Sequence, residues 1–539
     1  MDLEYTSKIT LCVTQTQFGK TFTAISKIMT EISQDEEYGR SIHLIFTMNT
    51  LLNNKQFAKR LETLENTYGK GSVIVFSSKY DGKYKHIKSR LELQGICADE
   101  STCPHIVVMC SNSHRYKDGL EFLKVLNNNK INIVRAFCYY DELHIYITSD
   151  RLRNQIEEIH NLDIMKGITA LSATPDKIFD DHEYWYKIRL IKLDNFSDLN
   201  YAGCKDMIFN CIDDFFENPY VRPHSFNYDE LDKQIIGFIE HVLNKYPEIL
   251  NDNTRSFIPA HIRRKGHNFV RDLIFNKNEN SVVVVLNGFE KTLQYKHSGN
   301  IKTIPLKSQD EEICETIAKI IIQYNLTSRP VVITGLLCVG VGQTLTHKLL
   351  GSFTSAIFGH LDLTNDEFYQ LFGRITGRMK DWPNYIKTQV YCPTKLMNRC
   401  IVMEECAIHM ATDYNGQIVS KETYRKPMIE MGEIGQSVIE NIRVANKKKV
   451  IKNKEDDTDK KIQIFDSQVE AIKFGKTLGV NFYKRNSNEA PKELQKYGIN
   501  PSSEELFKRM WGISNVNRAR MIPTSNEKWC VYWRPSLLC

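Results

Sequence analysis

The sequence predicts an α/β protein with two parallel sheets in series, followed by a small C-terminal α+β tail domain. Three observations lead to this fold class. Short apolar runs alternate with helix-like segments in the first third of the chain, and the alternation returns after about residue 250. A charged segment then precedes an aromatic-rich tail. Strands that alternate with helices favour parallel pairing through crossover helices.

Apolar runs typical of buried strands define the two predicted sheets. The first series lies at 8–13, 41–46, 73–76, 105–109, 133–140 and 167–171. The second series lies at 256–259, 281–286, 330–334, 355–358 and 388–391. Between the first two runs, residues 21–32 have apolar side chains at helical spacing. Two sheets in series suggest two similar domains with a cleft between them.

The same pattern predicts the domain boundaries. We expect a first sheet domain at 1–195, a helical linker or insertion at 196–250, a second sheet domain at 251–440, a charged linker at 441–462 and an accessory domain at 463–539. Residues 445–461 are typical of a solvated linker, with a binding arm as the alternative. The tail predicts an amphipathic helix near 467–478. Its aromatic and basic ending, 528–535, either forms a small core or stacks on bases.

Length and composition indicate an intracellular protein of the cytoplasm or nucleus. A chain of 539 residues is long enough for about three domains. No stretch reaches the ~18–20 apolar residues of a membrane helix, and the first residues do not resemble a secretory signal. The 14 cysteines contain no Cys-x-x-Cys pair, as expected for reduced thiols. The net charge of +6 permits nucleic-acid binding without requiring it.

The segment Thr14 to Thr21, called the phosphate loop below, lies between a predicted strand and a predicted helix. Such a loop presents backbone N–H groups and a helix N-terminus to phosphates. Lys20 can reach the β and γ phosphates, and the Thr21 hydroxyl can hold Mg²⁺. The expected nucleotide contacts are Thr16, Gln17, Phe18, Gly19, Lys20 and Thr21. Thr14 replaces the usual first glycine and Gln17 a frequent one, so the loop alone indicates only a phosphate-binding protein.

A second candidate, the acidic box Asp141 to His144, directly follows the apolar strand 133–140. An acid at the carboxyl end of a parallel strand points into the ligand crevice. We expect Asp141 to hold Mg²⁺ and Glu142 to orient or deprotonate the attacking water. We expect His144 to connect this site with the nucleic-acid side.

Two further segments complete the series. Residues 171–175 follow a strand, and Ser172 and Thr174 can hydrogen-bond to the acidic box. The segment 370–378, called the arginine segment below, contains Gln370, Arg374 and Arg378. A guanidinium forks onto phosphate oxygens, and one supplied across a cleft makes hydrolysis depend on domain closure.

The four segments occur in the order and at the spacing of two tandem domains, and residues 5–395 thereby resemble the superfamily 2 helicases of the DExH type. The resemblance implies two RecA-like domains, with ATP and Mg²⁺ in the cleft and a DNA or RNA strand across the top. As an abbreviated helicase core rich in Asn, Lys and Ile, the chain also resembles helicases of large DNA viruses. That likeness implies a viral factory or a virion as the location.

The resemblance assigns further residues. Thr47 and Asn49 correspond to motif Ia, and Ser111 to a second contact with the nucleic-acid backbone. The segment 335–346 is similar to motif V of the Snf2-like branch, which implies that Gly342 and Gln343 contact the nucleotide. The arginine segment has two residues between Arg374 and Gly377 where many relatives have one. Either arginine could therefore be the finger, and we favour Arg374.

Three functions follow as hypotheses. The first is an ATP-dependent helicase or translocase acting on DNA or RNA. The second is a nucleic-acid-binding scaffold with a degenerate ATPase core, such as a viral transcription or packaging component. The third is a translocase that does not separate strands. No membrane partner is expected, and the C-terminal domain is a candidate surface for protein partners.

Overall fold

The computed structural model divides into two units, residues 1–433 and 434–539, and each is described by itself. The described residues are 8–48, 51–77, 84–99, 101–128, 133–147, 149–179, 187–193, 199–217, 228–261, 263–287, 290–306, 312–336, 344–430, 461–477, 483–484, 511–512, 519–523 and 529–533.

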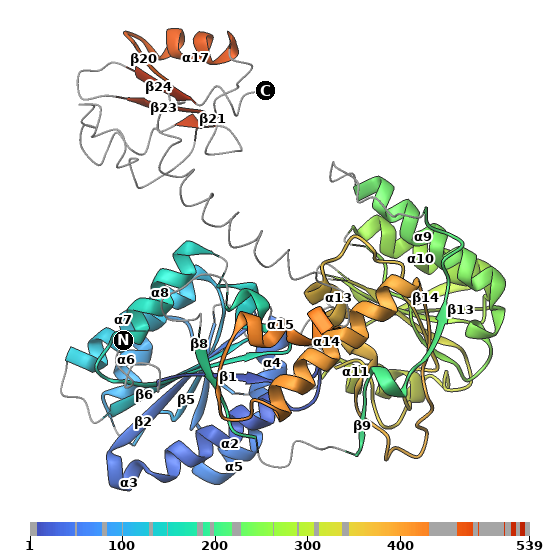
Figure 1. Cartoon of the computed structure of the whole chain (residues 1–539), viewed down its shortest axis with the longest axis horizontal. Coiled ribbons are helices and arrows are strands. Elements are labelled where there is room, and N and C mark those ends of the chain that lie inside the picture. The colour runs from blue at the N-terminus through green and yellow to red at the C-terminus, as the bar shows by residue number, and fades with distance from the viewer. Residues whose placement is uncertain are drawn as a thin grey trace. The chain divides into compact units, whose positions relative to one another are not determined.

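The first unit contains two large sheets, and the first of them has nine strands (Figure 1). In spatial order these are β19 (Ile418–Ser420), β8 (Lys187–Leu190), β1 (Ile9–Val13), β7 (Met165–Ser172), β6 (Ile133–Asp141), β2 (Arg40–Thr47), β5 (Ile106–Cys110), β3 (Val73–Phe76) and β4 (Lys85–Ile87). Every neighbouring pair is parallel except β8 and β19.

Helices cover both faces of this sheet. The connecting helices are α2 (Lys20–Ser33), α3 (Asp35–Tyr38), α4 (Leu51–Arg60), α5 (Glu62–Tyr68), α6 (Arg90–Cys97), α7 (Ser113–Asn128) and α8 (Asp150–His160). On one face, residues of α2, α4 and α5 form a core with alternate strand residues such as Ile45, Val108 and Tyr139. On the other face, Tyr116 of α7 stacks on Phe46. Because successive strand residues point to opposite faces, apolar runs in this sheet are continuous, as expected for a buried parallel sheet.

The second sheet has eight strands, with an antiparallel hairpin at one edge. In spatial order these are β10 (Ile208–Cys211), β18 (Gln389–Cys392), β16 (Ser355–Ile357), β11 (Arg255–Phe257), β15 (Val331–Gly335), β12 (Val282–Leu286), β13 (Lys291–His297) and β14 (Asn300–Pro305). Its helices are α9 (Tyr228–Lys245), α10 (Arg264–Lys277), α11 (Ile313–Gln323), α13 (Asn365–Phe372) and α14 (Thr394–Thr412). Residues of α9 and α10 pack together on one face of the sheet. The predicted fold class, two tandem RecA-like α/β domains, is confirmed.

The structure departs from the sequence pattern at the domain borders. Residues 196–250, expected to be a helical linker or insertion, contain β9 (Tyr201–Ala202), β10 and α9, and β10 belongs to the second sheet. Residues 418–430, expected in the second domain, form β19 and α15 (Lys421–Glu430), and β19 pairs with β8 of the first sheet. The carboxylate of Asp176, in the first domain, receives two hydrogen bonds of 2.6 Å from Arg425 of α15.

The chain therefore runs between the two sheets twice, once after β8 and once between α14 and β19. The two crossings touch each other. The Leu193 N–H donates to Asn415 Oδ1 at 2.7 Å, and Asn415 Nδ2 donates to the Leu193 carbonyl at 2.8 Å. One asparagine side chain thus joins both connections.

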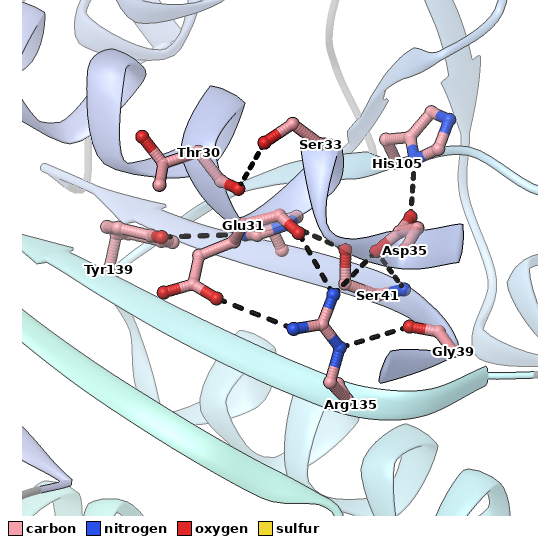
Figure 2. A network of polar contacts seen from close by, with 10 residues as sticks. Thr30, Glu31, Ser33, Asp35, Gly39, Ser41, His105, Arg135 and Tyr139 are labelled. Carbon is pink, nitrogen blue, oxygen red and sulfur yellow. Dashed lines mark hydrogen bonds and ion pairs between the residues drawn. The ribbon is translucent and has the colours of Figure 1, made fainter. Parts of the chain in front are cut away.

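A buried ion network holds the C-terminal end of α2 against the start of β2 and β6 (Figure 2). Arg135 of β6 donates to Asp35 Oδ1 at 2.8 Å and to the carbonyls of Glu31 and Gly39 at 2.9 and 3.0 Å. The Glu31 carboxylate lies 3.6 Å from the Arg135 guanidinium. Only 8% of Arg135 is exposed, so the guanidinium fixes the position of the helix that begins at the phosphate loop.

Replacing Arg135 with methionine should lower the free energy of unfolding by about 3 kcal/mol or more, because removal of one partner leaves the others buried and uncompensated. Urea unfolding followed by circular dichroism measures this loss. The control is Lys124→Met, which removes an exposed pair, 3.2 Å from Glu158, and should cost less than about 1 kcal/mol. Equal losses for the two variants would mean that the Arg135 network contributes no more than a surface pair.

In the second unit, a five-stranded sheet packs with one helix, α17 (Gln468–Thr477). In spatial order its strands are β20 (Lys461–Phe465), β24 (Trp529–Trp533), β23 (Ala519–Pro523), β22 (Trp511–Gly512) and β21 (Tyr483–Lys484), and all pairs are antiparallel. This unit confirms the predicted α+β tail. Val531 of the aromatic ending is fully buried.

Among the helices that the structure describes, none has the length and apolarity needed to cross a membrane.

Candidate active site between the two sheets

Three neighbouring strands bring the predicted first-domain segments to one edge of the first sheet. β1, β7 and β6 lie side by side and run parallel, with Val13 opposite Ser172 and Leu171 opposite Asp141. The phosphate loop, the acidic box and residues 171–175 each follow the carboxyl end of one of these strands. Since these ends meet at one edge, segments far apart in the sequence become neighbours.

The phosphate loop leads directly into α2. Gly19 precedes the helix with φ of +122°, a conformation that favours glycine, and no side chain caps the first N–H groups of α2. Uncapped N–H groups at a helix start are the usual partners of phosphate oxygens. Lys20, only 8% exposed, donates to the Gln15 carbonyl at 3.3 Å, which keeps its ammonium group at the mouth of the loop.

The acidic box places two carboxylates beside this loop. Glu142 has the left-handed backbone angle φ of +51°, which is rare for a residue other than glycine and clusters at functional sites. Burial raises the pKa of Glu142 to about 7, against the opposing effect of Lys20. Burial also raises the pKa of Asp141, and Lys20 and Arg60 oppose this rise. A carboxyl group with a pKa near neutrality is suited to accept a proton from water.

His144 links the acidic box to Ser172 and Thr174. Its Nδ1 lies 2.8 Å from Ser172 Oγ, and its Nε2 lies 3.2 Å from Thr174 Oγ1. Burial, together with Lys177 and Lys20, lowers the pKa of His144 to about 3. The imidazole is therefore neutral, and one ring nitrogen donates while the other accepts. Nδ1 also lies 3.5 Å from a Glu142 carboxylate oxygen.

The second domain contributes Gln370 and Arg374 from α13 and the turn that follows it. Gln370 Nε2 donates to Glu142 Oε2 at 3.3 Å and lies 3.5 Å from Thr174 Oγ1. Arg374 Nε donates to the Gln370 carbonyl at 3.1 Å. Burial lowers the pKa of Arg374 to about 10, and Glu142 favours its charged form. The guanidinium remains charged at neutral pH.

The first part of the phosphate loop packs against the second domain. Gln17 Nε2 donates to the Gly373 carbonyl at 2.9 Å, and the hydroxyls of Thr16 and Thr376 lie 3.1 Å apart. The rings of Phe18 and Tyr201 make an edge-type contact, with their centroids 5.2 Å apart. A Cβ atom on Gly373 would lie 2.5 Å from Thr16 Cβ, so a glycine is required at this contact. The side chains of Thr16, Gln17 and Phe18, predicted to contact nucleotide, thus contact the second domain.

A cavity of about 360 Å³ separates the two halves of this site, a volume within the usual range of small-molecule sites. Its walls are formed by both domains, and the lining residues are Thr16, Gln17, Gly19, Lys20, Thr21, Phe22, Ile25, Gln56, Phe57, Arg60, Asp141, Glu142, Thr344, Gln370 and Arg374.

Other predicted residues lie away from the cavity wall. Arg378 is exposed and pairs with Tyr201 in a short two-stranded sheet. Thr47 and Ser111 are buried, and the Ser111 N–H donates to the Thr47 carbonyl at 2.7 Å. Asn49, Gly342 and Gln343 lie outside the described residues.

Six cavity residues were not predicted from the sequence, namely Phe22, Ile25, Gln56, Phe57, Arg60 and Thr344. Phe22 and Ile25 lie on α2, and Gln56, Phe57 and Arg60 lie on α4, which follows the segment assigned to motif Ia. Thr344 lies within the segment 335–346 assigned to motif V, directly after the predicted pair Gly342 and Gln343.

The sequence matches no protein-family model and no curated protein. In structure, the chain is similar to S. cerevisiae Dbp5 bound to RNA and ADP BeF3, at 10% identity and a TM-score of 0.40, covering 78% of this chain and 89% of Dbp5. It is also similar to the Escherichia coli DEAH/RHA helicase HrpB, at 10% identity and a TM-score of 0.40, covering 79% of this chain and 48% of HrpB. The likeness concerns the fold alone.

Proposed function

We propose that this chain is a nucleoside-triphosphate hydrolase that works as a nucleic-acid motor, a helicase or translocase of the superfamily 2 type. One observation carries the proposal. In a single cavity, Lys20, Thr21, Asp141 and Glu142 of the first domain face Gln370 and Arg374 of the second.

The cavity suits a triphosphate with Mg²⁺. The cations Lys20, Arg60 and Arg374 line it, and the uncapped start of α2 adds backbone donors for phosphate oxygens. Thr21 and Asp141 offer the hydroxyl and carboxylate oxygens that Mg²⁺ prefers. Mg²⁺ bound there would neutralise charge on the phosphates.

Hydrolysis then follows from the positions of the protein groups. Glu142 orients a water molecule and takes its proton as the oxygen bonds to the γ phosphorus and the bond to the β,γ-bridging oxygen breaks. Lys20 and Arg374 stabilise negative charge on the phosphate oxygens. Gln370 holds the Glu142 carboxylate from the opposite domain.

The split site couples turnover to domain movement. Gln370 and Arg374 reach the nucleotide only while the second domain is close to the first. A nucleic acid that contacts both domains would hold them together and stimulate hydrolysis. His144, between Glu142 and the hydroxyls of Ser172 and Thr174, is the proposed connection to that nucleic acid.

The decisive experiment measures ATP hydrolysis with and without single-stranded and duplex DNA and RNA, over a salt series. We expect stimulation by nucleic acid, and we expect Lys20→Ala to reduce kcat/KM at least about 100-fold because a charged phosphate contact is lost. The matched control is Lys166→Ala, at an exposed position of the first sheet, which should retain activity. Comparison of DNA with RNA identifies the preferred strand.

Nucleic-acid binding without nucleotide binding or hydrolysis would instead indicate a scaffold with a degenerate core. If hydrolysis is stimulated, a tailed-duplex unwinding assay beside a triplex-displacement assay separates the two motor types. Displacement of the third strand without unwinding of the duplex would identify a translocase that does not separate strands.

A further inference from the structure

Arg60 contacts both sides of the cavity although no sequence motif includes it. It is the last residue of α4 in the first domain. Its Nη1 donates to Thr21 Oγ1 and its Nη2 to Thr344 Oγ1, both at 3.2 Å, and its Nε donates to Glu312 Oε1 at 3.3 Å. One guanidinium thus joins the proposed Mg²⁺ ligand to two residues of the second domain.

The neighbouring residue makes a parallel contact that avoids the cavity. Lys59 Nζ lies 2.5 Å from Glu315 Oε2. Glu312 and Glu315 lie at the N-terminal end of α11, where they form a capping box. Lys59, Arg60, Glu312 and Glu315 are called the interdomain clamp below. Two basic residues that end a helix of one domain meet two acidic residues that begin a helix of the other.

The Thr21 hydroxyl is the point where the clamp and the nucleotide compete. Mg²⁺ held by this oxygen would come close to the Arg60 guanidinium, whose Nη1 donates to the same oxygen at 3.2 Å. Two cations so close repel each other unless anionic oxygens lie between them. A γ phosphate supplies such oxygens, and a guanidinium binds them in a forked geometry.

We infer that Arg60 is a γ-phosphate sensor, which exchanges its hydrogen bond to Thr21 for the terminal phosphate while Glu312 keeps it attached to the second domain. This inference rests on the proposed function. Two guanidinium groups, one from each domain, would then contact the phosphates in the cavity. Arg374 comes from the second domain, whereas Arg60 comes from the first and transmits the presence of the γ phosphate to α11.

The Lys59 contact provides an internal control. Lys59 belongs to the same helix and clamp, and both partners of the Lys59–Glu315 pair are about one-third exposed. Exposed pairs of this kind contribute little. If Arg60 only holds the domains together, loss of either basic residue should have similar consequences. If Arg60 senses the γ phosphate, only its loss should distinguish a triphosphate from a diphosphate.

The experiment compares Arg60→Gln, Arg60→Lys and Lys59→Gln in the full chain. The dissociation constants of fluorescent ADP and of a non-hydrolysable ATP analogue are measured in the presence of Mg²⁺. The parameters kcat and KM for ATP hydrolysis are measured as well. For Arg60→Gln we expect the affinity for the ATP analogue to fall about tenfold or more, with less than a threefold change for ADP. Arg60→Lys should recover part of the loss, and Lys59→Gln should change neither affinity more than threefold.

The outcomes separate the two proposals. Equal losses of affinity for ADP and for the ATP analogue would overturn the sensor role, and so would the same behaviour in Arg60→Gln and Lys59→Gln. The proposed function would still stand if the wild-type protein hydrolyses ATP. Absence of nucleotide binding and hydrolysis in the wild-type protein would overturn both. Thermal unfolding followed by circular dichroism verifies that each variant is folded. If Arg60→Gln is unfolded, Arg60→Lys, which keeps the charge, tests whether loss of the guanidinium weakens binding of the ATP analogue more than binding of ADP.

Discussion

Glutamine in place of Glu142 is expected to reduce kcat for ATP hydrolysis by about 10²–10⁴-fold, the usual contribution of a positioned general base. The substitution keeps the size of the side chain and its ability to accept the hydrogen bond from Gln370. It removes the carboxylate that takes the proton from water. The affinity for ATP in the presence of Mg²⁺ should therefore change much less than the rate of hydrolysis. Titration with a fluorescent nucleotide measures the affinity, and single-turnover hydrolysis measures the rate.

The matched control for this substitution is Glu158→Gln, the same chemical change on the exposed side of α8, next to Lys124. It should leave kcat within about twofold of wild type, as expected for a surface position outside the site. A Glu142→Gln protein that hydrolyses ATP at the wild-type rate would remove Glu142 from the mechanism. The water would then have to be oriented by another group at the cavity.

Alanine in place of Arg374 should lower kcat by about 10³-fold or more, by analogy with arginine fingers that act on a transferring phosphate. The guanidinium is buried at the cavity, and Glu142 favours its charged form. Arg374→Lys should recover little of the activity, because an ammonium group cannot fork onto two phosphate oxygens. The measurement is kcat at saturating ATP and nucleic acid.

Arg378 provides the comparison for this prediction, since it lies four residues later in the same segment. It is exposed and does not line the cavity. Arg378→Ala should therefore keep at least about one-tenth of wild-type turnover. If Arg378→Ala loses more activity than Arg374→Ala, the finger is Arg378, and the segment must turn in the nucleotide complex to bring it to the phosphate.

The residues that sequence could predict are those next to a strand in the same domain. The phosphate loop and the acidic box each follow an apolar run, and a parallel sheet brings such ends together without further information. Gln370 and Arg374 were predicted from a local segment as well, and both line the cavity. The sequence did not decide between Arg374 and Arg378, because that choice depends on the turn that follows α13.

The contact of Arg60 with the second domain left no local pattern in the sequence. Arg60 and Thr344 lie 284 positions apart and touch only because the cleft brings α4 to the second domain. Thr16 and Gln17, predicted to contact nucleotide, line the cavity, and their side chains also bond to the arginine segment. A sequence motif specifies which backbone can approach a phosphate, but it does not specify what covers the other side of the loop.

The sequence did not predict β14, and this omission has a different cause. β14 is exposed along nearly its whole length, and polar residues separate its two isoleucines, so it lacks the continuous apolar run that identifies a buried strand. Thr47 and Ser111 show the reverse problem. A polar residue after a strand is expected at the surface, yet these two are buried, and a backbone hydrogen bond between them joins β2 to the residue that follows β5.

The asparagine that ties the two crossings together has a mechanical consequence. Asn415 bonds to both backbone groups of Leu193, so both covalent paths between the sheets pass through one place. The two domains also touch across the cavity, so these covalent paths are one of several connections between them. When the noncovalent contacts open, any rotation of one domain about this place moves groups far from Asn415 further than groups close to it.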